Sequence, residues 1–235
     1  MKIFVVIATY NEKDNIVNLI NEILDLNIEG LNIIVVDDNS PDGTAQIVRN
    51  NFIGSSNVSI IVRNNERGYG SAHIAGFWEA LKSRADIIIS MDADFSHQPK
   101  VLPEMIDYIT QGYDVVVGSR RVPGGKIIGW GVVRSTASYV AMVMTRFILG
   151  IKTRDVTTGF RAYRSTVIPT LEFATIKSNG YSFLEEVVYR CEKAHLKIKE
   201  IPITFNDRQF GQSKFSIKEI IKFFITIFKL RLGIK

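Results

Sequence analysis

The chain has 235 residues, of which 46% are hydrophobic and 23% are charged, and its formal net charge at pH 7 is +5. This length and composition are typical of one α/β domain with a substantial core, and they exclude an intrinsically disordered chain. The single cysteine, Cys191, excludes an internal disulfide framework and is typical of a protein from a reducing compartment.

In chain order, the first half alternates short runs rich in Ile and Val with amphipathic helical patterns. The predicted strands cover residues 3–8, 32–37, 58–62, 86–91 and 114–118. The predicted helices cover residues 13–26, 42–52, 70–83 and 99–111. The first run passes into polar residues without a cleavage site, which indicates a buried strand rather than a signal peptide. This order predicts a mostly parallel, Rossmann-like sheet with helices on both faces, which binds ligands at the carboxyl ends of its strands.

The second half of the chain is less regular. Glycines between residues 124 and 129 indicate a loop, which precedes an apolar helix over residues 132–149. The remaining predicted elements are a helix over 184–194, a strand over 197–205 and a last helix over 216–232.

Two aspartates, Asp92 and Asp94, directly follow the fourth predicted strand. Two carboxylates at such a place need a counter-charge, because desolvated like charges are costly. A divalent cation that bridges them to a diphosphate supplies it, and Mg²⁺ or Mn²⁺ prefers these hard oxygens. The alternative for so short a motif is a pair of solvated loop aspartates. The strand context and the acidic pair Asp37 and Asp38 favour the metal.

A second polar stretch, residues 37–44, follows the second predicted strand. Asp38 is placed to accept hydrogen bonds from the ribose or base of a nucleotide, as an acid past a strand does in dinucleotide folds. The same stretch also predicts a turn and a helix cap, with Ser40, Pro41 and Asp42 in that role. The two interpretations are compatible.

Five stretches occur in order: ATYNE (8–12), VVDDNSPDGT (35–44), DADFSHQP (92–99), GSR (118–120) and RQFGQSK (208–214). Together they resemble the dolichol-phosphate mannose synthases, which are inverting family 2 glycosyltransferases of GT-A fold. The resemblance covers essentially the whole chain. It implies transfer of mannose from GDP-mannose to a dolichyl (polyprenyl) phosphate, with a β-linked product.

The resemblance also implies a set of donor-binding residues: Ala8, Tyr10, Glu12, Val36, Asp38, Asp92, Ala93, Asp94, Arg120, Arg208 and Lys214. In this scheme the two aspartates at 92 and 94 act through the metal, and the last two residues close over the donor from a late loop. Ala8 stands where the family often has proline. Ser96 stands where some members have a glutamine metal ligand, and a hydroxyl is the weaker ligand.

The acceptor is expected to need positioning more than a general base, because a phosphate monoester has its second pKa at roughly 6. Arg134 and Ser138 lie one helical turn apart and could hold that phosphate, and the resemblance points to the same two residues. We expect Asp94, Arg120 and Arg134 to be catalytic in a single in-line displacement with inversion. Glu186 matches a family acid of uncertain role, and a structural ion pair explains it equally well.

The net positive charge is confined to the end of the chain. Six of the 29 basic residues and one of the 24 acidic residues fall within 213–235, so residues 1–212 are electrically neutral. Lysines on one stripe of the last predicted helix, with apolar residues around the rest, predict an interfacial helix that contacts anionic headgroups. The alternative is a helix packed on its own domain or on the spanning helices of a partner.

We therefore expect two units, a GT-A catalytic domain over 1–212 and a basic amphipathic membrane-associating helix over 213–235. No stretch has the roughly 18–20 apolar residues that would cross a bilayer. Peripheral attachment at the cytoplasmic face of a membrane is expected, either directly or through a small membrane-spanning partner subunit. Nucleic acid is not an expected partner.

The main rival is a polyprenyl-phosphate glucosyl- or aminosugar-transferase that uses a UDP-sugar. An aspartate-nucleophile phosphatase is disfavoured because its aspartate motif follows the first strand, whereas Asp92 and Asp94 follow the fourth. A non-enzymatic membrane- or nucleic-acid-binding module remains a third class.

Several other motifs are discounted. The string Gly68-Tyr69-Gly70 lacks the third glycine of a dinucleotide site. The histidines His73, His97 and His195 lack zinc spacing. Arg161 and Arg164 are interpreted as structural.

Overall fold

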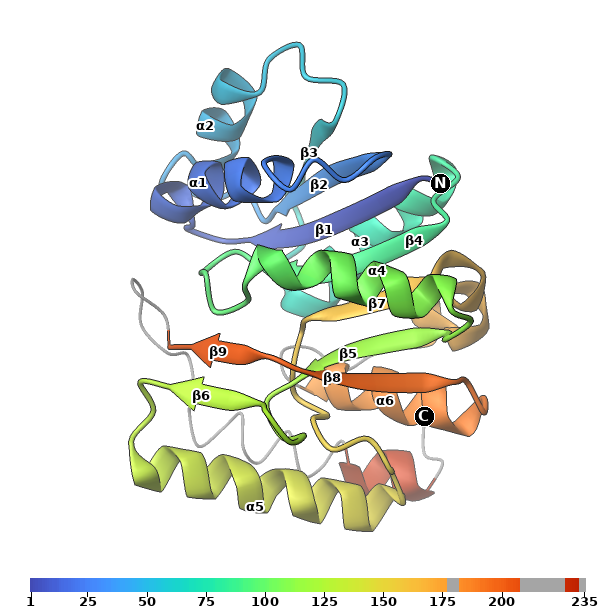
Figure 1. Ribbon diagram of the computed structural model, residues 1–235. Helices are drawn as coiled ribbons and strands as arrows, with labels where there is room; N and C mark the ends of the chain where they lie inside the picture. The colour runs from blue at the N-terminus through green and yellow to red at the C-terminus, as the bar shows by residue number, and fades with distance from the viewer. Residues whose placement is uncertain (177–181, 208–226, 233–235) are drawn as a thin grey trace.

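The computed structural model describes residues 1–176, 182–207 and 227–232 (Figure 1). A seven-stranded sheet forms its centre, in the order β3-β2-β1-β4-β7-β5-β8. Its strands are β1 (Ile3–Thr9), β2 (Leu31–Asp37), β3 (Val58–Val62), β4 (Ile87–Asp92), β5 (Val115–Ser119), β7 (Arg161–Arg164) and β8 (Ile198–Pro202). Pairing is parallel except at β7, which runs antiparallel to both of its neighbours. A small second sheet pairs β6 (Lys126–Ile128) with β9 (Thr204–Asn206) in parallel.

Helices cover both faces of the sheet, as the continuous apolar strands predict. One core lies under α1 (Lys13–Leu24), α2 (Thr44–Asn51) and α4 (Leu102–Thr110), and the other under α3 (Tyr69–Lys82) and α6 (Ser182–Lys193). Alternate residues of β1 enter opposite cores, Val5 and Ile7 in the first and Val6 in the second. Short 3₁₀ turns complete the set: η1 (Pro99–Val101), η2 (Ser165–Val167), η3 (Pro169–Leu171) and η4 (Phe173–Thr175).

Helix α5 (Val132–Leu149) lies at the end of the molecule opposite α1 and α2 (Figure 1). Its residues Met142 and Leu149 form a third apolar cluster with Ile227 of the helical segment 227–232. The described end of the chain therefore packs beside α5.

The mostly parallel α/β sheet is confirmed, and its first five predicted strands match within one residue at each end. The predicted helices also match within two residues, except that the one over 99–111 begins with η1. The single strand predicted over 197–205 is wrong. The chain leaves the main sheet after Pro202, where the Ile203 amide donates to the Ser119 carbonyl at 3.0 Å, and then joins β6. The predicted helix over 216–232 lies mostly outside the described residues.

Candidate active site

The register of three neighbouring strands brings predicted donor-binding residues into one row. Ala8 near the end of β1 is paired with Val36 of β2 on one side and with Asp92 of β4 on the other. Tyr10 and Glu12 follow directly, and the Glu12 amide donates to Thr44 Oγ1 at 3.0 Å. Residues that are far apart in the sequence therefore meet at the carboxyl edge of the sheet.

The turn after β2 is held by its two aspartates. Asp37 is fully buried and accepts hydrogen bonds from Thr9 Oγ1 at 2.9 Å and Ser40 Oγ at 2.5 Å. Asp38, expected at the nucleotide, forms a buried ion pair with Arg63 and accepts the Gly68 amide at 2.8 Å. Asp38 thus connects the end of β2 to the start of α3.

Asp42 has the capping role that the sequence predicts. It accepts the backbone amides of Thr44 at 2.9 Å and Lys13 at 3.1 Å, and so joins the first turns of α2 and α1. Burial by itself would raise the pKa of Asp42, but these hydrogen bonds outweigh it and the pKa is lowered.

Asp92, the last residue of β4, and Asp94, in the loop that follows, accept hydrogen bonds from different groups. Asp92 Oδ1 accepts the Tyr69 hydroxyl at 2.8 Å, and the Asp92 amide donates to His97 Nδ1 at 3.2 Å. Asp94 is 5% exposed and accepts the Ser96 amide at 3.1 Å. Burial lowers the pKa of His97, so its ring is neutral and Nδ1 can act as the acceptor.

The oxygens of this loop suit a hard divalent cation. Ser96 Oγ is buried and makes no hydrogen bond within the described part of the chain. Buried hydroxyls are usually hydrogen-bonded, so this oxygen is compatible with a further ligand. Over residues 1–176, 182–207 and 227–232 there is no group of three or more His, Cys, Asp or Glu side chains placed to hold a metal. Two carboxylates and a hydroxyl match Mg²⁺, which commonly takes its other ligands from water and substrate phosphates.

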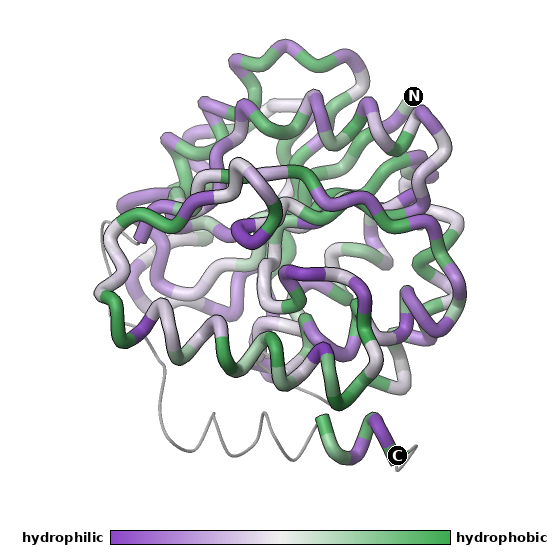
Figure 2. Tube along the Cα trace, turned by 60° about the horizontal axis from the view of Figure 1, so that its bottom comes forward, coloured by the Kyte–Doolittle hydropathy of each residue, from purple (hydrophilic) through white to green (hydrophobic). Residues whose placement is uncertain are grey.

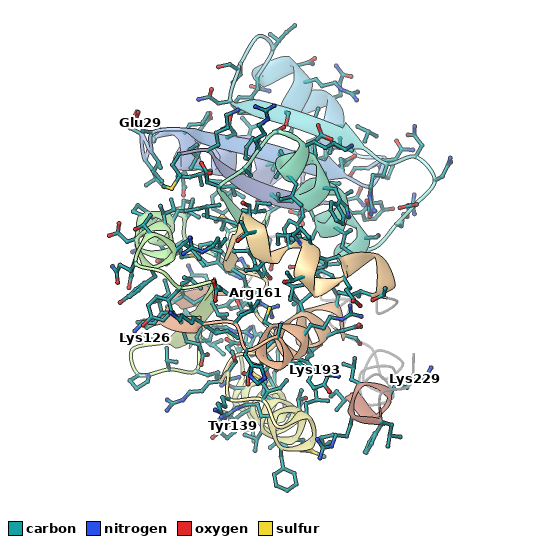
Figure 3. The ribbon with its side chains drawn as sticks, turned by 90° about the vertical axis from the view of Figure 1, so that its right-hand side faces the viewer. Glu29, Lys126, Tyr139, Arg161, Lys193 and Lys229 are labelled. Carbon is teal, nitrogen blue, oxygen red and sulfur yellow. The ribbon has the colours of Figure 1, made fainter. Side chains whose placement is uncertain are left out.

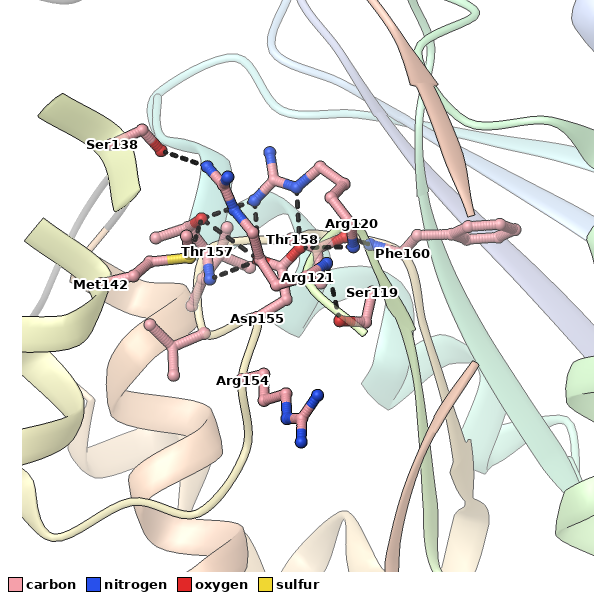
Figure 4. A network of polar contacts seen from close by, with 12 residues as sticks. Ser119, Arg120, Arg121, Ser138, Met142, Arg154, Asp155, Thr157, Thr158 and Phe160 are labelled. Carbon is pink, nitrogen blue, oxygen red and sulfur yellow. Dashed lines mark hydrogen bonds and ion pairs between the residues drawn. The ribbon is translucent and has the colours of Figure 1, made fainter. Parts of the chain in front are cut away.

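Arg120 lies at the end of β5 in a polar network around Asp155 (Figure 4). Its Nε and Nη2 donate to the two oxygens of Asp155, both at 2.7 Å, and Nη2 also donates to Thr157 Oγ1 at 2.6 Å. Burial raises the pKa of Asp155, but the charge and hydrogen bonds of Arg120 outweigh it and the pKa falls below its usual value. Asp155 was missed from the sequence because no motif distinguishes it.

The predicted acceptor residues lie on α5. Arg134 is 46% exposed at its side chain, pairs with Asp207 at 3.0 Å, and has its guanidinium carbon 4.1 Å from the centre of the Trp130 ring. Ser138 accepts a hydrogen bond from Arg121 Nη2 at 3.3 Å. Arg121 was also missed from the sequence, although its place beside Arg120 just past a strand was a usable signal. Burial and the neighbouring Arg120 lower the pKa of Arg121.

Two neighbouring glutamates of α6 differ in their hydrogen-bond partners. Glu186 pairs with Arg190, whose Nε lies 3.0 Å from Glu186 Oε1, which favours the structural interpretation. Glu185 is 1% exposed, and neither carboxylate oxygen has a hydrogen-bond partner among the described residues. Burial raises the pKa of Glu185 to about 8. Arg161, interpreted as structural, is buried near α6 and donates to the carbonyls of Leu184 and Val156 (Figure 3).

Arg208 and Lys214, expected over the donor, lie outside the described residues.

Comparison with known proteins identifies relatives along the chain. The profile described as "Glycosyl transferase family 2" matches residues 4–171. An undecaprenyl-phosphate mannosyltransferase from Micrococcus luteus is 37% identical over 92% of this chain and 88% of its own. A polyprenol monophosphomannose synthase from Mycolicibacterium smegmatis is 35% identical over 90% of this chain and 80% of its own. A dolichol-phosphate mannosyltransferase from Pyrococcus furiosus is 38% identical over 98% of this chain and 64% of its own.

Solved structures show the same fold at lower identity. Glucosyl-3-phosphoglycerate synthase from Mycobacterium tuberculosis, in complex with Mn²⁺, UDP and glucosyl-3-phosphoglycerate, has a TM-score of 0.69 at 20% identity. The match covers 100% of this chain and 81% of that one. The predicted GT-A-like fold is confirmed by this likeness.

Proposed function

The chain belongs to glycosyl transferase family 2, and on that premise we propose that it transfers mannose from GDP-mannose to a polyprenyl (dolichyl) phosphate, with inversion. Three relatives at 35–38% identity carry names of polyprenyl-phosphate mannose transfer, which supports the sugar and the acceptor class. The observation that carries the proposal is the oxygen set of Asp92, Asp94 and Ser96 at the carboxyl edge of the sheet, beside the row formed by Ala8 and Val36.

The donor side requires neutralisation of the departing diphosphate. Bound Mg²⁺ or Mn²⁺ would be held by Asp92 and Asp94, with Ser96 as a third oxygen, and would supply positive charge to that leaving group. The protein contributes the orientation of these oxygens. The Ser96 amide fixes Asp94, and the loop amide of Asp92 is fixed on His97. Arg120 would add guanidinium donors held rigidly by Asp155, whose carboxylate compensates most of the arginine's charge.

The acceptor side is proposed at the start of α5. Arg134 presents a partly exposed guanidinium, and Ser138 lies one turn further along the helix with Arg121 bonded to it. A phosphate that entered here would meet two guanidinium groups and a hydroxyl, which are strong donors to a dianion. It would exchange with the Asp207 carboxylate at Arg134. Because the acceptor is already ionised, these residues position the nucleophile and remove no proton.

We place the membrane against the outer face of α5. Val133, Val140 and Phe147 repeat every seven residues, which puts them on one side of the helix. Their exposed fractions are 85%, 49% and 89%. The helix carries no acidic residue. Figure 2 shows the segment 227–232 beyond this helix, and its Lys229 and Arg231 are exposed.

An apolar face bordered by basic residues fits an anionic lipid surface. By length and composition α5 could also cross a bilayer, contrary to our expectation that no segment would, and 17% of it is buried in the protein. The contacts of Met142 and Leu149 favour a helix that lies along the surface. In that position Arg134 and Ser138 meet a lipid phosphate at headgroup level. Attachment to the cytoplasmic face, directly or through a small membrane-spanning partner, is part of the proposal.

A donor panel with detergent-solubilised polyprenyl phosphate tests the reaction. We expect turnover with GDP-mannose and Mg²⁺ or Mn²⁺, none after chelation, and none with UDP-glucose. The rival donor is a UDP-sugar, and one structure of the M. tuberculosis synthase contains UDP-glucose. Turnover of UDP-glucose without turnover of GDP-mannose would replace the proposal by that rival.

Vesicle co-sedimentation tests the membrane face. Phe147→Ser should release the protein from anionic vesicles while its turnover of a short, water-soluble polyprenyl phosphate is unchanged. Ile53→Ser is the matched control, because Ile53 is 87% exposed but lies next to α2 at the other end of the molecule. Equal binding of the two variants to vesicles would place the contact elsewhere.

A further inference from the structure

The carboxylate of Asp92 is held by a side chain that no sequence motif indicates. Tyr69 is the first residue of α3, and its hydroxyl donates to Asp92 Oδ1 at 2.8 Å. The terminal torsion of an aspartate is broad, so a hydrogen bond to one oxygen decides how the carboxylate plane is turned. The Tyr69 hydrogen bond therefore sets the direction of both carboxylate oxygens, and Oδ2 lies 3.8 Å from His97 Nδ1.

The position of Tyr69 is itself fixed by contacts of the preceding residue with Asp38 and Arg63. The preceding residue, Gly68, has φ of 151°, donates its amide to Asp38 and accepts Arg63 Nη2 at 3.2 Å. The Tyr69 ring packs on His73, with the ring centres 4.5 Å apart. A continuous set of contacts therefore runs from the acid at the end of β2 to the acid at the end of β4.

Gly159 leaves the space that the hydroxyl occupies. A Cβ at this position would lie 2.1 Å from Tyr69 Oη and 3.1 Å from Asp92 Oδ1, but 3.4 Å from Tyr69 Cζ. The first distance is impossible and the last is an ordinary contact. Glycine at 159 is thus required mainly by the oxygen of Tyr69, with a second, weaker constraint from Asp92 Oδ1, whereas the Tyr69 ring carbon alone would tolerate a methyl group.

We infer that Tyr69 is a positioning residue that orients Asp92 for the divalent cation, with Gly159 as the space that admits its hydroxyl. The inference depends on the proposed function, because it assumes the metal at Asp92. Hydrogen-bonded partners behind a metal ligand commonly change metal affinity by about 10- to 100-fold when removed.

The test measures Mn²⁺ binding in the presence of GDP by electron paramagnetic resonance of the free ion, without turnover. Tyr69→Phe should raise the dissociation constant about tenfold and raise the Mn²⁺ concentration for half-maximal activity equally. At saturating Mn²⁺ its kcat should return to within about twofold of wild type, which a general loss of packing would not allow. Tyr108→Phe, which removes a hydroxyl from a ring packed on Tyr113, is the matched control and should change neither value.

A double-mutant cycle with Gly159→Ala separates orientation from simple damage. Gly159→Ala alone should weaken Mn²⁺ binding, because its methyl group displaces the hydroxyl of Tyr69. In the Tyr69→Phe background the same alanine should cost clearly less than in wild type, because the 2.1 Å clash is gone and only the tight 3.1 Å contact with Asp92 Oδ1 remains. Additive losses, or a Tyr69→Phe protein that binds Mn²⁺ like wild type, would overturn the inference. Failure of the wild-type protein to bind Mn²⁺ with GDP would instead overturn the proposed function.

Discussion

Asp155→Asn is the sharpest test of how the site is built. Asp155 is fully buried, and its two oxygens receive Arg120 Nε, Nη2 and the Arg120 amide at 2.7–2.9 Å. Asparagine keeps the shape but removes the negative charge and leaves a buried guanidinium uncompensated. Removing one partner of such a pair typically costs about 3–5 kcal/mol. At about 2–4 °C per kcal/mol for a protein of this size, that is a fall in Tm of about 6–20 °C.

Urea denaturation at pH 7 measures this loss, with Asp107→Asn as a surface control that should stay within about 0.5 kcal/mol of wild type. The pKa of Asp155 is lowered in the folded protein, so its contribution is fully present above the ordinary aspartate value of about 3.9 and is lost at lower pH. The gap between wild type and variant should be constant from pH 5 to 8 and narrow only below about pH 4. A loss under about 1 kcal/mol at pH 7 would refute the reasoning.

Three further predictions concern other parts of the molecule. Burial raises the pKa of Glu185 from 4.5 to about 8, so the folded state holds a proton that the unfolded state releases and stability falls as pH rises between these values. Glu185→Gln should remove that fall in unfolding free energy between pH 5 and 8, and an unchanged slope would contradict the assignment. Gly76→Ala places a Cβ 2.3 Å from Val6 Cγ1, so denaturation should show a loss of about 1–3 kcal/mol, whereas Gly131→Ala has open space and should show little. Asp94→Asn should lower kcat by at least about 100-fold in a mannose-transfer assay, with Tm nearly unchanged, and retained turnover would remove the metal from the mechanism.

The first half of the fold could be predicted from the sequence because its strands and helices are local patterns. Runs such as residues 3–8 are apolar on both faces, and the helices between them repeat with the helical period. The short strand β7 could not be predicted, because its four residues are two arginines on either side of Ala162 and Tyr163, and they gain their place only by pairing with β4 and β5. A four-residue strand set by distant partners has no signal of its own.

The residues of the candidate site could be predicted where a motif contains them. Ala8, Val36 and Asp92 were expected together, and the strand register brings them into one row. The side chains that hold these residues in place were missed. Tyr69 stands in the string Gly68-Tyr69-Gly70, which does not match a dinucleotide site, and its contact with Asp92 spans 23 residues. Long-range pairing of this kind follows from the completed sheet, which local spacing does not encode.

The reversed strand β7 also affects the order in which the protein can assemble during synthesis. Once residue 92 has been made, strands β1 to β4 can all hydrogen-bond to one another. This half of the sheet can therefore pair before the rest of the chain is synthesised. Strand β5 comes next in the chain, but its neighbours in the sheet are β7 and β8. At least 42 further residues, up to Arg161, must leave the ribosome before β5 gains a partner. Until then both backbone edges of this apolar strand are unpaired, and a nascent chain that pauses between residues 119 and 161 is the stage most in need of chaperone protection.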